Sequence, residues 1–138
     1  MKYKFLDHTA DIMFEAYGNS LNKLFENAAL ATEDTMVDLK QINQDIIKKI
    51  ELKNKNVEIL LYDFLSELVY FKDAELLLFS NFKVSIEKNN IYSLKAILYG
   101  EKLNEKHEQK VDVKAVTLHK FEIVKKKNHY IARVILDI

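Results

Sequence analysis

The sequence predicts an α+β fold, with one domain over residues 1–138 and a mostly antiparallel β-sheet packed against two α-helices. Three observations predict this class. Two stretches, near residues 20–36 and 57–72, carry apolar side chains at helical spacing. The runs that flank these stretches alternate apolar and polar residues, which is typical of strands. From residue 75 onward the apolar segments all have this strand pattern, and residues typical of hairpin turns separate them.

The N-terminal half alternates strands with helices. Its predicted strands are Lys2–Asp7, Ile12–Tyr17 and Ile46–Lys53. Gly18 breaks the second strand, and Ser20 is the expected N-cap of a helix that ends near Glu33 to Met36. The second helix, Val57–Lys72, is apolar around most of its circumference. We therefore expect it to be the central buried helix.

The C-terminal half is predicted to be strands joined by turns. The expected strands are Glu75–Phe79, Phe82–Glu87, Ile91–Tyr99, Val111–Val124 and Tyr130–Ile138. Asn89-Asn90 is a tight-hairpin signal because both residues tolerate positive φ. Lys125–Asn128 forms a second hairpin, whose lysines are either a solvated turn or an electrostatic contact point. Residues 101–109 are the one long polar loop, in which His107, like His129 of the second hairpin, is expected to be solvated.

Composition is that of a folded domain without a membrane segment. The chain has 138 residues, 49% hydrophobic and 30% charged, enough to bury roughly 68% of its unfolded surface. No apolar run approaches the roughly 18 residues of a membrane span. Met1-Lys2-Tyr3-Lys4 leads directly into Asp7-His8 rather than into the apolar core of a signal peptide. The sequence thus predicts a cytoplasmic protein.

The absence of Cys and the balance of charge exclude several kinds of site. Without Cys there is no disulfide, thiolate zinc site or thiol nucleophile, so any metal must be bound by oxygen or imidazole. Lys plus Arg and Asp plus Glu both number 21, so no global positive charge favours strong direct nucleic-acid binding. Arg133 is the only arginine, which rules out a clamp of several arginines on phosphate.

The densest polar segment near the N-terminus is Asp7-His8-Thr9-Ala10-Asp11, between two short apolar runs. Two carboxylates and an imidazole beside buried strands are costly unless they are paired, hydrogen-bonded or bound to a cation. Turn chemistry is the simpler interpretation, because Asp and Thr side chains bond readily to nearby backbone. Taken alone, this segment favours the turn.

The chain ends with a second acidic group. In the last strand Asp137 follows Ile131, Arg133 and Ile135 on one face, and the α-carboxylate of Ile138 lies beside it. If this strand lies against the 7–11 junction, Asp11, Asp137 and the carboxylate of Ile138 form an oxygen-rich cluster. Such a cluster suits Ca²⁺ best, with Mg²⁺ or Mn²⁺ as alternatives. A frayed terminus with a solvated Asp is the plain alternative.

The remaining candidates lie in the stretch Val113–His119. Lys114, Thr117 and His119 are polar positions in an apolar run, and His119 could pair with His8. A third nitrogen ligand or a zinc spacing is missing, which argues against zinc. Gly18 and Gly100 are too isolated to form a phosphate-binding loop, and no nucleophile motif is present. We therefore predict that the chain is not an independent enzyme.

Four features together resemble the archease family. They are Asp7-His8-Thr9-Ala10-Asp11-Ile12, Gly18 with the following Leu24-Phe25 helix, Lys114-Ala115-Val116-Thr117-Leu118-His119, and the final Asp137-Ile138. The resemblance extends over essentially the whole chain, and the first and third motifs are specific in combination. The sequence departs from the family pattern at Leu118, where an aromatic residue is common, and at Asn104, where an acidic residue is usual.

The resemblance implies a small α+β protein that assists an RtcB-type tRNA-splicing ligase by promoting guanylylation of its catalytic histidine. It also implies a cation site at Asp11, Asp137 and Ile138 and a functional lysine at Lys114. The expected mechanism is presentation of the cation-bearing carboxylates and Lys114 to the ligase active site, by the electrostatic logic of metal-assisted phosphoryl transfer.

Two alternatives remain open. The first, also suggested for archeases, is a chaperone or modulator of other RNA-processing or RNA-modifying proteins. The second is a metal-dependent hydrolase that uses His8, Asp11, His119 and Asp137. Stimulation of a ligase at sub-stoichiometric amounts separates ligase activation from the chaperone role, and turnover without a partner would indicate the hydrolase.

Overall fold

The computed structural model describes residues 1–8 and 10–138, in which the chain forms two α-helices and seven strands. The strands are β1 (Tyr3–Leu6), β2 (Ile12–Gly18), β3 (Ile46–Asn54), β4 (Leu77–Lys88), β5 (Tyr92–Lys102), β6 (Ala115–Lys125) and β7 (Tyr130–Asp137). The helices are α1 (Leu21–Met36) and α2 (Val57–Glu75), with a short 3₁₀ turn, η1 (Leu39–Gln41). The α+β class is confirmed.

The strands form two antiparallel sheets, where the sequence analysis predicted one. The first sheet has the order β1-β2-β7-β6, and the second has the order β3-β5-β4. The strands of the second sheet occur together in the middle of the chain, whereas the first sheet pairs both ends of the chain. Alternation of apolar residues identifies strands but does not specify their partners, which is why the prediction of a single sheet was wrong.

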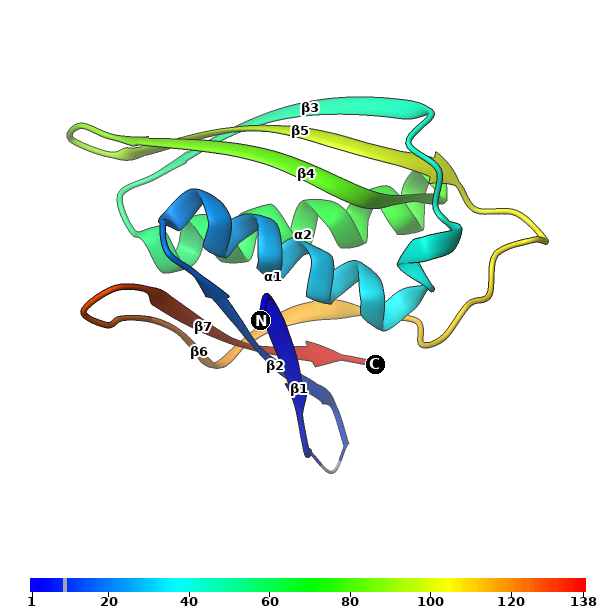
Figure 1. Ribbon diagram of the computed structural model, residues 1–138, viewed down its shortest axis with the longest axis horizontal. Coiled ribbons are helices and arrows are strands. Elements are labelled where there is room, and N and C mark those ends of the chain that lie inside the picture. Colours follow the sequence, from blue (N-terminus) through cyan, green and yellow to red (C-terminus); the bar gives the residue numbers. More distant parts are fainter. Residues whose placement is uncertain (9) are drawn as a thin grey trace.

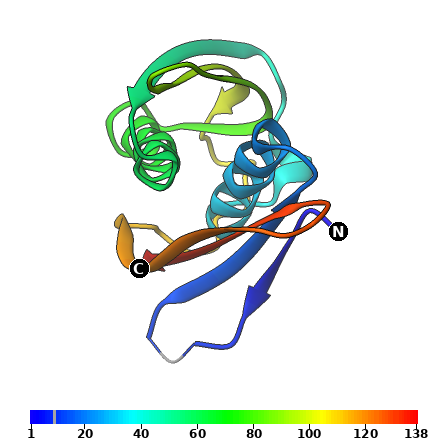
Figure 2. The ribbon, with the colours of Figure 1, turned by 90° about the vertical axis from the view of Figure 1, so that its left-hand side faces the viewer.

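Both helices lie between the two sheets (Figure 1). The side view shows α1 and α2 next to each other, with the β3-β5-β4 sheet on one side and the β1-β2-β7-β6 sheet on the other (Figure 2). A helix covered on two sides must be apolar over a wide arc. This explains the composition of α2, whose fully buried side chains include Leu60, Phe64 and Leu68. The predicted central position of α2 is confirmed.

Side chains of α1 bond to the free edge of β4. Asn22 Oδ1 accepts from Ile86 N at 2.9 Å, and Glu26 Oε2 accepts from Val84 N at 2.9 Å. Further along the helix, Glu33 Oε2 accepts from Phe79 N at 3.3 Å. The outer amides of an edge strand otherwise need water or another strand. One face of α1 thus takes the place of a neighbouring strand.

Four predicted elements differ clearly from the structure. β5 continues past Tyr99 to Lys102, so the first two residues of the predicted polar loop belong to a strand. β4 is one strand with an irregularity between Phe79 and Asn81, not two strands. α2 continues past Lys72 to Glu75 and is capped by Leu76 in the left-handed conformation, at φ 56°. β6 begins at Ala115 rather than Val111. In each case the local pattern was correct, but tertiary contacts moved the end of the element.

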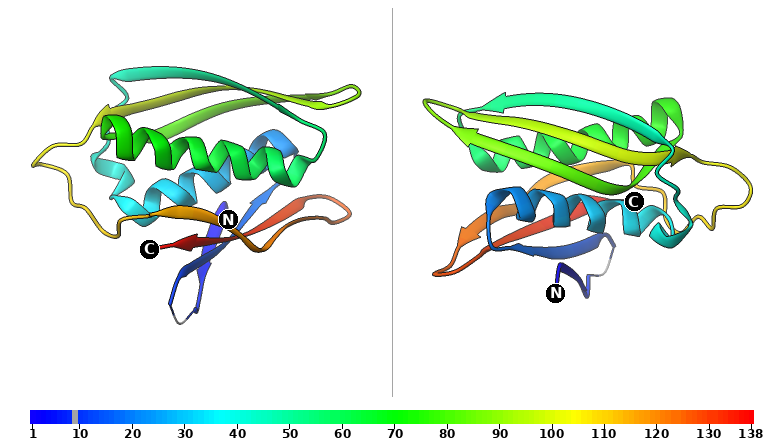
Figure 3. Two further views of the ribbon diagram at one scale, coloured as in Figure 1. Left: turned by 180° about the vertical axis from the view of Figure 1, so that it is seen from behind. Right: turned by 45° about the horizontal axis from the view of Figure 1, so that its top comes forward.

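Neither helix in the described part of the chain is long and apolar enough to span a membrane. Figure 3 shows that the β1–β2 hairpin projects from the body of the molecule and that the segment after β5 runs around one end of the helix layer. The carboxyl end of β7 lies in the same sheet as this hairpin.

The contact between α1 and β4 predicts a difference between two substitutions of one residue. Glu26→Ala leaves the Val84 amide without its acceptor, so we expect the free energy of unfolding to fall by about 1–2 kcal/mol. Glu26→Gln keeps an acceptor oxygen and should cost less than half as much. Urea denaturation measures both, and equal losses would show that the charge, rather than the hydrogen bond, stabilises this edge.

Candidate functional site

The ladder between β2 and β7 brings the two acidic segments together. Ile12 pairs with Leu136, so the next residues outward along the two strands are Asp11 and Asp137. On the other side of β7, Ala115 of β6 pairs with Asp137. The backbone of Asp137 therefore lies between β2 and β6, at the end of the sheet. This is the convergence that the sequence analysis made conditional on the position of the last strand.

Asp11 and His8 face each other across the turn that joins β1 to β2. The His8 Nδ1 and Asp11 Oδ2 atoms are 4.0 Å apart, and the two side chains are 25% and 34% exposed. Asp7 is exposed, and Thr9 lies outside the described residues. This contact joins two residues three apart in the sequence, and it leaves the Asp11 carboxylate partly accessible to solvent.

Ile138 follows Asp137 in the chain, and Lys114 is bonded to it from the segment that leads into β6. The side chain of Ile138 packs against the core, which fixes the end of β7. The Lys114 amide donates to the Asp137 carbonyl at 2.8 Å, while its side chain is exposed. Lys114 directly precedes β6, which is an edge strand of the sheet. Its exposure therefore does not require a long side chain to extend from a buried central strand to the surface. Its ammonium group is available for contact with a partner.

The other two candidates occupy β6 itself. Thr117 Oγ1 donates to the Ile135 carbonyl at 3.1 Å, so this hydroxyl is engaged in the sheet. His119 is exposed in the irregular part of β6, where the register with β7 shifts and Lys120 has φ 53°. Leu118, at the position where archeases commonly carry an aromatic residue, is 54% exposed. In this irregular segment the side chains of Leu118 and His119 are both exposed to solvent.

The donor set is chemically suited to a hard cation. The side-chain oxygens at this end of the sheet are the carboxylates of Asp11 and Asp137, and Ile138 follows directly after Asp137. Oxygen-only ligands favour Ca²⁺, Mg²⁺ or Mn²⁺. Within residues 1–8 and 10–138, no three side chains of His, Asp or Glu are grouped to hold a metal. These side chains therefore give no support to the hydrolase alternative.

The polar loop after β5 is held by one buried carboxylate. Glu101 Oε1 accepts from Asn43 N at 3.0 Å and lies 2.7 Å from His107 Nε2, while Lys106 Nζ is 3.2 Å from Oε2. His107 Nδ1 accepts from the Asn104 amide at 2.9 Å, so Nε2 carries the proton that bonds Glu101. The prediction that His107 is solvated was wrong, since its side chain is fully buried. The exposed position predicted for His129 is confirmed.

The loop contacts lower the pKa of Glu101. The hydrogen bond from the Asn43 amide contributes most, followed by those from His107 and Lys106, and together they lower the pKa to about 2. Asn104 also accepts from the Lys106 amide at 2.9 Å. An Asn at this position is therefore explained by the turn that it closes.

Comparison with known proteins identifies relatives that match nearly the whole chain. A sequence model of the archease protein family matches residues 3–138. The protein archease of Sulfolobus acidocaldarius is 45% identical over 138 residues, which are 99% of each chain. The chain belongs to the archease family.

Two archease-like structures have the same fold. The solution structure of a Methanobacterium thermoautotrophicum protein is 41% identical, superposes with a TM-score of 0.89, and is matched over 99% of each chain. An archease from Thermotoga maritima, described as a possible chaperone, is 20% identical with a TM-score of 0.66, over 98% of this chain and 96% of that one. The second comparison supports the fold alone.

One polar feature of this archease gave no sequence signal. A cleft of about 660 Å³ is lined by residues from the chain start, β2, α1, β4 and the β6–β7 hairpin. Its basic residues include Lys2, Lys23 and Lys83, which are far apart in the sequence. Only the fold brings them to one place, so spacing rules could not have identified them.

The low pKa of Glu101 predicts how stability responds to acid. A carboxyl whose pKa is about 2 when folded and near its ordinary value when unfolded stabilises the fold above pH ~4.5, and this contribution is lost as the pH falls towards 2. Glu101→Gln removes the titrating group. The difference in unfolding free energy between wild type and Glu101→Gln should therefore shrink from pH 5 to pH ~2.5, as followed by thermal melts. A difference independent of pH would contradict this account.

Proposed function

We propose that this archease activates an RtcB-type tRNA-splicing RNA ligase in the cytoplasm, by promoting guanylylation of the ligase catalytic histidine and so allowing repeated turnover. In this proposal the chain is a protein cofactor of the ligase rather than an enzyme. The observation that carries it is the register of β2, β7 and β6, which sets Asp11, Asp137 and the Lys114 backbone side by side at an exposed sheet end.

Each residue would have a separate task. Asp11, Asp137 and Ile138 would hold a divalent cation, which supplies charge stabilisation for phosphoryl transfer when it is bound. Lys114 would contact the ligase or its nucleotide through the exposed ammonium group. His8 would orient Asp11, whose Oδ2 lies 4.0 Å from its Nδ1, and the exposed His119 and Asp7 would contact the partner. Thr117 would maintain the strand geometry beneath Lys114 through its bond to Ile135.

A chaperone or modulator role towards RNA-processing proteins is the second candidate. It follows from the same family membership, because this role is also implied by the resemblance to archeases. Ligation assays at one part archease to about 20 parts ligase distinguish the two roles. An activator restores many turnovers per molecule at this ratio, whereas a binding chaperone is limited by stoichiometry.

The proposed cation site predicts that Asp137→Asn removes binding of Ca²⁺, Mg²⁺ and Mn²⁺ in calorimetric titrations. Asn keeps the size and hydrogen bonds of Asp but not its charge. Because the metal-free carboxylates repel one another, the metal-free variant should melt at or above the temperature of the metal-free wild type. Asp63→Asn, on α2, is the matched control and should bind as the wild type does. Equal binding by wild type and Asp137→Asn would refute the site.

The proposed role of Lys114 predicts that Lys114→Met abolishes ligase stimulation while leaving folding and cation binding intact. The side chain is exposed, so its removal should change the melting temperature little. Lys55→Met, in the exposed turn before α2, controls for the loss of one charge. Ligase guanylylation, measured with radiolabelled nucleotide, is the readout. If Lys114→Met stimulates the ligase as fully as the wild type does, the proposed role of Lys114 is wrong.

A further inference from the structure

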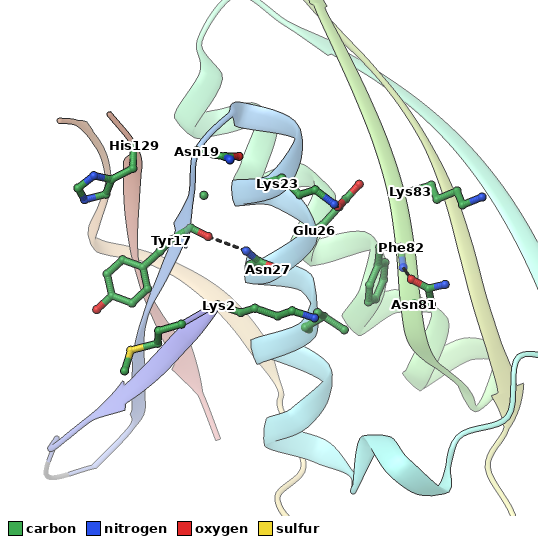
Figure 4. Close-up of a pocket in the computed structure, with 13 residues that line it drawn as sticks. Lys2, Tyr17, Asn19, Lys23, Glu26, Asn27, Asn81, Phe82, Lys83 and His129 are labelled. Carbon is green, nitrogen blue, oxygen red and sulfur yellow. Dashed lines mark hydrogen bonds and ion pairs between the residues drawn. The ribbon is translucent and has the colours of Figure 1, made fainter. Parts of the chain in front are cut away.

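The cleft that gave no sequence signal lies between the β1-β2 end of one sheet and β4 of the other (Figure 4). Its volume of about 660 Å³ falls within the range of small-molecule sites. Lys2 enters from the chain start and extends towards α1, and Lys23 lies on the first turn of that helix (Figure 4). The backbone of Lys2 is held in place by β2, since the Tyr17 amide donates to the Lys2 carbonyl at 2.8 Å.

Positive charge exceeds negative charge in the cleft. Glu26 is the one acidic residue in the described lining, against Lys2, Lys23 and Lys83. The Glu26 carboxylate is already engaged, with Oε2 bonded to the Val84 amide at 2.9 Å and Oε1 at 3.2 Å from Lys23 Nζ. The Lys83 ammonium group lies over the Tyr99 ring and points away from the cleft, so among the described lining residues the ammonium group of Lys2 is the one left without an opposite charge (Figure 4). In a chain of zero net charge this is a local excess.

The β6–β7 hairpin also borders the cleft. His129 lines the cleft, and its carbonyl accepts from the Lys126 amide at 2.8 Å, which closes the hairpin that carries Lys125–Lys127. These three lysines are exposed, as the solvated turn predicted for them requires, and within the described lining the hairpin reaches the cleft through His129.

We propose that this cleft binds a phosphate-bearing anion of about nucleotide size. Ammonium groups are point charges that can approach a tetrahedral phosphate from several directions, whereas planar carboxylates are matched by arginine forks. Lys2 and Lys23 enter the cleft from two sides, and the single arginine of the chain is elsewhere, bonded to Glu15 at 3.0 Å. The polar lining residue Asn19 could contact the rest of the ligand.

The cleft is independent of the proposed activation site. It lies at the Lys2 and Tyr17 end of the β1–β2 hairpin, whereas Asp11 is at the opposite end of β2. Two kinds of ligand carry such phosphates, namely free nucleotides and nucleic-acid strands. The lining of the cleft does not by itself distinguish between them. The local charge excess is compatible with the neutral chain, because it requires a few phosphates in one cleft and not a long polyanion on the surface.

The test is calorimetric titration of the full chain with tripolyphosphate, a nucleoside triphosphate and a single-stranded RNA octamer, at about 50 mM salt. We expect binding at sub-millimolar concentration that weakens as salt is raised. Lys2→Gln/Lys23→Gln should weaken it about tenfold or more. The control Lys55→Gln/Lys88→Gln removes the same charge from exposed positions outside the lining and should bind as the wild type does.

Amide spectra locate the bound anion. Gly18 lines the cleft and is one of only two glycines, so its ¹⁵N resonance is easily recognised and should shift together with that of Asn19. Tighter binding of the nucleotide than of tripolyphosphate identifies a base contact, and tighter binding of RNA than of both identifies a strand as the ligand. The proposal is overturned if none of the three binds below about 1 mM, if both lysine pairs lose affinity equally, or if an acidic peptide binds as tightly.

Discussion

The fold depends on hydrogen bonds between helix side chains and sheet edges. Among the described strands no ladder joins the two sheets, so the helices between them provide the connection. α1 bonds the edge of β4 through Asn22, Glu26 and Glu33, and α2 bonds the edge of β6 through Glu58, whose Oε2 accepts from Ile123 N at 2.8 Å. Each of these bonds forms only when the helix has one particular rotation about its axis and the strand has one particular register. Together the bonds select a single packing arrangement from the many that apolar contact alone allows.

Glu33 shows the cost of this arrangement. Its side chain is fully buried, and only one of its two oxygens has a hydrogen-bond partner among the described residues. Burial raises the pKa of Glu33 well above its ordinary value, against the opposing effects of the Phe79 amide and of Lys72. A buried carboxyl without full hydrogen bonding is destabilising by itself. Its benefit is positional, because an apolar residue there could not hold the β4 edge.

The sequence was informative where chemistry is local. Residue spacing predicted the helices and most strands, including the last strand, at whose end Asp137 is exposed. The link between Asp11 and Asp137 came partly from resemblance, since only the register of β2 with β7 makes them neighbours. The buried His107 was mispredicted because Glu101, which lies six residues away and binds it, gives no periodic signal. Pairing of strands and contacts between loops depend on the whole chain, so a local pattern cannot specify them.

The two ends of the β1–β2 hairpin carry opposite charge, and their separation decides whether they influence each other. β2 has seven residues, which at about 3.3 Å each span about 23 Å. This is more than twice the Debye length of about 8–10 Å at physiological salt. Carboxylates at Asp11 and lysines around Tyr17 therefore act as separate sites on one rigid strand, although they cancel in the net charge. A cation bound at one end should change anion affinity at the other only at low salt, or through movement of the strand itself.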